Sequence, residues 1–68
     1  MPDFHEVFRR VAQQHGLDER QEVVMLRCYS ALCIFEEGHP EYVEAYEVLE
    51  ADPVLFAAAS ELADAMCQ

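Results

Sequence analysis

Acidic side chains recur at every third position of one segment, and this spacing is the most chemically informative pattern in the chain. The series and its two flanking acids are Glu37, Glu41, Glu44, Glu47, Glu50 and Asp52. On a helix, a step of three residues turns by about 300°, so successive carboxylates lie about 4.5 Å apart along the axis and drift around its outer face. Carboxylates at this spacing repel one another, and the segment contains no Lys or Arg to relieve them. The pattern predicts a docking surface for an Arg- or Lys-rich protein partner. An ordinary solvated helix face is the competing interpretation.

The chain as a whole is also strongly acidic, and its basic residues all lie in its first part. The net charge is −10, and no basic residue follows position 27. The four bases are Arg9, Arg10, Arg20 and Arg27. Such a field repels phosphate and anionic lipid, which argues against direct nucleic-acid or membrane-surface binding and favours basic partners. The chain also lacks Lys and Asn, as GC-rich codon usage would produce, so base composition is a second explanation for the acidity.

A Glu-x-x-His pair, Glu36 and His39, has the spacing that di-iron helical bundles use for metal ligands. Here Gly38 is expected to end one helix and Pro40 to begin the next, so the two side chains need not share a face. We therefore expect His39 to cap the following helix, with Glu36 in solvent. A metal site assembled across a dimer remains an alternative, and no cofactor is predicted.

The three cysteines, Cys28, Cys33 and Cys67, cannot all pair within one molecule, and none lies in a CxxC motif. Cys28 and Cys33 are five residues apart, about 140° around a helix, and cannot hold one ion together. We expect both to be small core residues in a reduced protein, and Cys67 to be exposed. The N-terminus resembles no signal peptide, and the apolar stretch 23–35 is too short to cross a bilayer, so the expected location is the cytoplasm.

Residues for covalent catalysis are not arranged in a recognisable way. Ser30 and Ser60 are the only serines, and neither lies in a Gly-rich turn or next to a His or Asp that could activate it. The two glycines, Gly16 and Gly38, do not form a phosphate-binding loop. We therefore expect a protein that is not an enzyme.

Four helices are predicted, over residues 3–15, 19–37, 40–50 and 53–66. Asp3 with Glu6 and Asp18 with Gln21 are typical capping-box pairs at helix starts. Pro40 and Pro53 occupy first helical positions, where a missing N–H does no harm. Gly16 and Gly38 are expected to end the first and second helices.

These elements indicate an all-α fold, a small four-helix bundle with short turns in one domain spanning residues 1–68. The second helix is apolar on nearly every side between Val23 and Phe35, so we expect it at the centre, surrounded by sequential antiparallel neighbours. Apolar residues make up 53% of the chain. A chain this short buries only about 60% of the surface that it exposes when unfolded. We therefore expect some of its apolar side chains to remain on the surface and to pack against a second copy in a homodimer.

The sequence thus predicts a small acidic cytoplasmic protein that acts by protein–protein interaction, as an accessory or regulatory subunit. It would dock a basic partner through its acidic third helix. Two alternatives stay open: a metal- or thiol-dependent protein with its site across a dimer, and a structural subunit without activity of its own.

Overall fold

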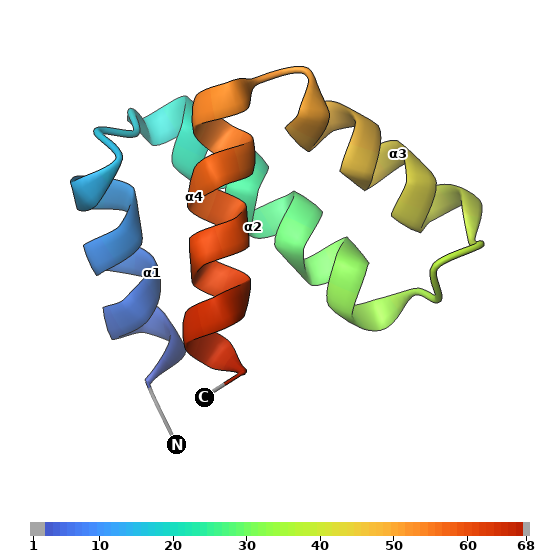
Figure 1. Cartoon of the computed structure of the whole chain (residues 1–68), viewed down its shortest axis with the longest axis horizontal. Coiled ribbons are helices and arrows are strands. Elements are labelled where there is room, and N and C mark those ends of the chain that lie inside the picture. Colours follow the sequence, from blue (N-terminus) through green and yellow to red (C-terminus); the bar gives the residue numbers. More distant parts are fainter. Residues whose placement is uncertain (1–2, 68) are drawn as a thin grey trace.

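The computed structural model describes residues 3–67, and this part of the chain forms four α-helices joined by short turns (Figure 1). They are α1 (Phe4–Gln14), α2 (Glu19–Ile34), α3 (Pro40–Glu50) and α4 (Pro53–Met66). The predicted all-α four-helix fold is confirmed. None of these helices is long and apolar enough to cross a membrane.

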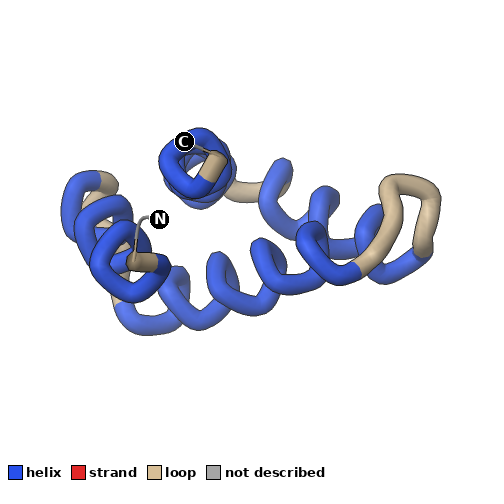
Figure 2. Tube along the Cα trace, turned by 90° about the horizontal axis from the view of Figure 1, so that it is seen from below, coloured by secondary structure: helices blue, strands red, loops and turns tan. Residues whose placement is uncertain are grey.

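The helices lie in two layers, so the molecule is flat, with extents of 30 × 27 × 15 Å. Figure 2 shows α2 running alone along one side, with α1, α4 and α3 side by side above it. α4 lies between α1 and α3 and contacts all three other helices. α4 is therefore the middle helix of the upper layer, and α2 forms the layer beneath it.

The turn between α1 and α2 has the helix end and the helix start that the sequence predicts. Asp18 and Gln21 form a reciprocal capping box at the start of α2, with Asp18 Oδ1 accepting the Gln21 N–H at 2.8 Å. Gly16 has a positive φ of 65°. The Gly16 and Leu17 N–H groups donate to the Gln13 and Ala12 carbonyls, the two bonds of a Schellman helix end. This turn directs α2 away beneath α4.

The end of α2 differs from the prediction. The helix stops at Ile34, three residues before the expected end, and Phe35 is extended with φ −99° and ψ 152°. Gly38 has no positive φ and does not terminate the helix. Instead, the Phe35 ring turns back and stacks on the His39 ring, with centroids 4.5 Å apart. This aromatic contact depends on a chain reversal, which helix-ending signals do not encode.

The core lies where α1, α2 and α3 meet α4. Its most completely buried large side chains are Val11, Met25 and Leu62, from α1, α2 and α4. α1 packs mainly against α4 rather than against its neighbour in sequence, α2. His15, at the end of α1, also contacts α4, with 3.3 Å between its Nε2 and Glu61 Oε2. Sequential antiparallel packing was therefore the wrong expectation for the first pair of helices.

α2 is less enclosed than its composition predicts. Three of its large apolar side chains remain exposed, and they are Val23 (51%), Leu26 (43%) and Ile34 (74%). Because the other helices all lie on one side of α2, its opposite side has no covering element (Figure 2). Part of the high apolar content of the sequence thus lies on the surface of α2 rather than in the core.

Candidate functional site

The acidic residues of α3 all lie on the surface, but they do not share one face. Glu41, Glu44, Glu47 and Glu50 are exposed, as is Glu37 in the preceding loop. From Glu41 to Glu50 is nine residues, and at about 100° per residue the direction around the helix turns by roughly half a circle. The two ends of the series therefore point in opposite directions, and its first and last pairs are centred about 120° apart around α3.

The first pair faces α2. Glu41 and Glu44 line a surface hollow of about 350 Å³ together with Arg27 and Val48. In the sequence these carboxylates have no basic neighbour, and within the described residues neither of them forms an ion pair with a Lys or Arg. The fold packs α3 against α2 and so brings an arginine from 14 positions before Glu41 into their hollow.

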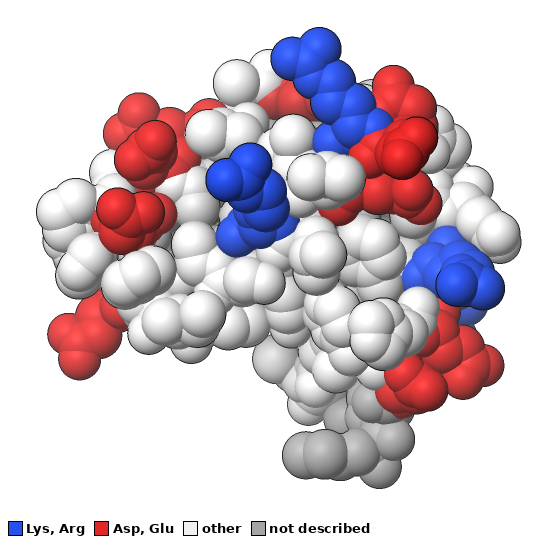
Figure 3. Space-filling model, turned by 180° about the vertical axis from the view of Figure 1, so that it is seen from behind, with Lys and Arg blue, Asp and Glu red and all other residues white. Residues whose placement is uncertain are grey.

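The second pair faces away from Arg27. Glu47 and Glu50 line a hollow of about 370 Å³ with Glu37, Tyr42 and Tyr46. No Lys or Arg lines this hollow among the described residues. Figure 3 shows acidic side chains at the α3 end of the molecule and also beside the basic ones toward its α1 end. Within the acidic series, Glu37, Glu47 and Glu50 therefore line a hollow without a Lys or Arg among the described residues, whereas Glu41 and Glu44 share theirs with Arg27.

Asp52, the last acid of the predicted surface, has a structural role at the start of α4. Its Oδ1 accepts hydrogen bonds from the N–H groups of Val54 and Leu55 at 3.1 and 3.2 Å. Its Oδ2 accepts one from the Gln21 side chain of α2 at 3.3 Å. With both oxygens engaged, this carboxylate is less available to a partner than the glutamates of α3.

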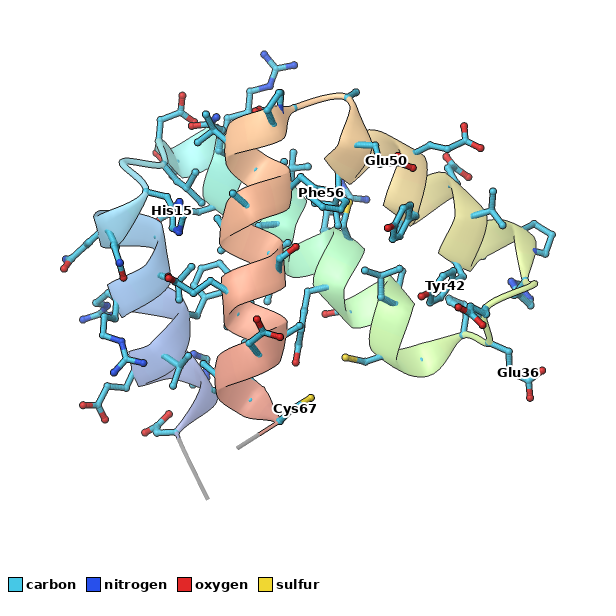
Figure 4. All side chains as sticks on the ribbon, in the orientation of Figure 1. His15, Glu36, Tyr42, Glu50, Phe56 and Cys67 are labelled. Carbon is cyan, nitrogen blue, oxygen red and sulfur yellow. The ribbon has the colours of Figure 1, made fainter. Side chains whose placement is uncertain are left out.

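Glu36 and His39, the weak metal candidates, lie in the α2–α3 loop. His39 caps α3, since its Nδ1 accepts the Glu41 N–H at 3.1 Å. Glu36 points away from the body of the molecule (Figure 4). No group of three His, Cys, Asp or Glu side chains within residues 3–67 is placed to hold a metal ion.

The feature that the sequence reasoning missed is an aromatic cleft between α3 and α4, with α2 as its floor. Its volume is about 350 Å³, and its aromatic lining is Tyr29, Tyr42, Tyr46 and Phe56. Tyr46 stacks on Tyr42 with centroids 6.4 Å apart and meets Phe56 edge-on at 5.7 Å. In Figure 4, the labelled Tyr42 and Phe56 side chains face the space between α3 and α4. The available sequence signal was one aromatic residue in each of α2 and α4 and two in α3, a pattern equally typical of an ordinary core.

Two of the three free cysteines line the same cleft, Cys33 from α2 and Cys67 from the end of α4. Cys67 is exposed as predicted, but Cys33 is also exposed, so its assignment to the core was wrong. Cys28 is buried, and that burial raises the pKa of its thiol above 9.0, partly offset by Arg27. Burial also raises the pKa of the Tyr29 hydroxyl above 10.0, and the nearby Cys33 thiol adds to this. Both shifts favour the neutral forms of the Cys28 thiol and the half-buried Tyr29 hydroxyl.

Among the described residues, the lining of the cleft is uncharged and mostly aromatic and aliphatic, and its polar groups are hydroxyls and thiols. Carboxylates of the neighbouring hollow lie along its α3 side. No protein-family profile, curated protein or solved structure matches this chain.

Proposed function

We propose that this chain is a small accessory protein that binds a basic protein partner through the acidic side chains of α3. The observation that supports it best is the aromatic cleft beside α3, whose rim carries Glu37, Glu47 and Glu50 and whose lining includes no Lys or Arg among the described residues. Aromatic side chains are enriched at the centres of protein interfaces, and unpaired charge at the rim accelerates and orients association. We place this function in the cytoplasm, where three free thiols are stable.

The proposal predicts salt-sensitive capture of a basic protein. Tagged wild-type protein and a variant with Glu41, Glu44, Glu47 and Glu50 all changed to Gln are compared in pull-downs from the lysate of the source organism. We expect a basic protein to bind the wild type at low salt, to elute at high salt and to be lost with the Gln variant, because screening weakens exposed ion pairs.

The Gln variant keeps the length and polarity of the side chains while removing their charge. Circular dichroism of both proteins serves as the folding control. Equal recovery of the same partner by wild type and variant would rule out docking through α3.

We further propose that the chain forms a homodimer through the outer side of α2. Val23, Leu26 and Ile34 are exposed there. α2 carries two acids and two arginines, so pairing two copies brings no net charge together. Sedimentation should show a dimer at micromolar concentration that Leu26→Glu converts to monomer, and a wild-type monomer at that concentration would refute this.

A further inference from the structure

The cleft between α3 and α4 is an open groove with walls made only of helices. α2 forms its floor, α3 carries Tyr42 and Tyr46 on one wall, and α4 carries Phe56 and Ser60 on the other. Tyr46 is 40% exposed, so a large part of its ring faces solvent. Residues 3–67 supply both walls and the floor and leave the groove open, with room for an occupant.

The charges around the cleft favour an occupant that is positively charged. Tyr42 and Tyr46 line both the cleft and the neighbouring hollow that contains Glu37, Glu47 and Glu50. Arg27 lies in a separate hollow. A basic side chain of an occupant would therefore meet aromatic faces and carboxylates together, which favours Lys and Arg through both ion pairing and cation–π attraction.

The walls also select the shape of the occupant. One way in which an extended peptide binds is by adding a strand to a sheet edge, and the described residues form no strand to offer. Helix backbones bond internally, so α3 and α4 present few main-chain partners to such a peptide. A helical segment satisfies its own backbone and can lay apolar side chains into a groove between two helices.

We propose that this cleft binds an amphipathic helix of a partner protein. Its apolar side chains would rest on Tyr42, Tyr46 and Phe56, with Lys or Arg beside Glu47 and Glu50. The inference rests on the proposed function and adds the form and position of the basic segment.

The test uses three dye-labelled helical peptides of about 14 residues, slightly longer than α3 at about 1.5 Å per residue. The first has a Leu stripe flanked by Lys, the second has Ala in place of Leu, and the third has Glu in place of Lys. Affinities come from fluorescence anisotropy. Because the wild-type chain contains no Trp, quenching of its tyrosine emission by a peptide without Tyr or Trp reports contact with the cleft.

Three variants locate the binding site. Ser60→Trp fills the groove from an exposed position of α4 without changing any charge. Glu47→Lys with Glu50→Lys reverses the rim beside the cleft. Glu41→Lys with Glu44→Lys makes the same change of charge on the side of α3 that faces Arg27 and serves as the matched control.

We expect the Leu/Lys peptide to bind the wild type at least about tenfold more tightly than either other peptide, because few contacts carry most of the energy of an interface. Ser60→Trp should weaken it by a similar factor, and the Glu47/Glu50 pair should weaken it more than the Glu41/Glu44 pair. Circular dichroism establishes that each variant is folded. If Ser60→Trp unfolds the chain, Ser60→Arg is used to fill the groove instead. Quenching of the wild-type tyrosine emission then reports whether the peptide contacts the cleft.

Other outcomes overturn the proposal in distinguishable ways. Equal binding of the Ala/Lys peptide, or no effect of filling the groove, would leave an electrostatic docking surface and remove the cleft from it. Binding of none of the three peptides would reject an amphipathic helix as occupant, while the pull-down decides the proposed function separately. A wild-type dimer that Ser60→Trp dissociates would show that a second copy of this chain fills the cleft.

Discussion

At position 39, one imidazole ring makes two contacts that hold the α2–α3 loop. Its Nδ1 accepts the Glu41 N–H and caps α3, and its face stacks on Phe35. The stacking lies within the loop, because α2 ends at Ile34 and the chain reverses between the two rings, whereas the cap joins the loop to Glu41 of α3. The cap was predictable from the His-Pro pair, whereas the stacking was not.

Removing the cap acceptor at His39 should destabilise the protein. We expect His39→Ala to lower the free energy of unfolding by about 1 kcal/mol, the usual cost of losing an N-cap. His39→Asn should lose less, because the Asn oxygen can accept the same N–H. Urea denaturation followed by circular dichroism measures both.

His5→Ala is the matched control for that pair, since His5 is also exposed but contributes only its backbone N–H to the Asp3 cap. It should change stability by less than about 0.5 kcal/mol. Equal losses for the Ala and Asn variants at position 39 would mean that stacking on Phe35, rather than the cap, accounts for the effect.

At the scale of the element, the two glycines differ in a way that their sequence context does not reveal. Both were expected to end helices, yet only Gly16 has a positive φ. An added Cβ at either position would meet no atom within 4 Å. Backbone conformation alone therefore separates them.

We expect Gly16→Ala to destabilise the protein by about 1 kcal/mol, because a left-handed conformation strains any residue with a Cβ. Gly38→Ala should be neutral or stabilising by up to about 1 kcal/mol, because Ala reduces the freedom of the unfolded chain at a position that it tolerates. Thermal and urea unfolding of the two single variants provide the comparison. A larger loss at position 38 than at position 16 would contradict the turn geometry.

The third helix shows what an element can and cannot predict about a site. Its acidic spacing correctly predicted exposed carboxylates, because a three-residue step on a helix places them by geometry alone. Which of them remain without a basic neighbour depends on Arg27, from another helix. The sequence therefore predicts which α3 carboxylates are exposed but not which of them share a hollow with a base.

At the scale of the whole molecule, burial of Cys28 and Tyr29 makes stability depend on alkaline pH. Both groups have a raised pKa in the folded chain, above 9.0 for Cys28 and above 10.0 for Tyr29. From about pH 9 upward, the unfolded chain therefore releases these protons before the folded chain does. Their contribution is fully present below that range and is lost as the pH rises through the folded values.

We therefore expect the free energy of unfolding to fall in the alkaline range, as the pH rises through the raised pKa values of Cys28 and Tyr29 in the folded chain. A variant with Cys28→Ala and Tyr29→Phe should show a shallower fall, although its stability at pH 7 will be lower because both changes alter packing. Urea unfolding at successive pH values gives the slopes, which are compared rather than the absolute stabilities. Equal slopes in the two proteins would show that other groups cause the loss.

Local physics in the sequence determined the helices, most of their caps and the exposure of the α3 glutamates, because periodicity and N-cap chemistry act within a few residues. Tertiary structure decided which helices meet. It placed α4 between α1 and α3, left one side of α2 bare, set Arg27 beside Glu41 and Glu44, and brought the aromatic rings of three helices around one cleft. Those outcomes depend on contacts between residues far apart in the chain, and an apolar stripe does not specify which other stripe will cover it.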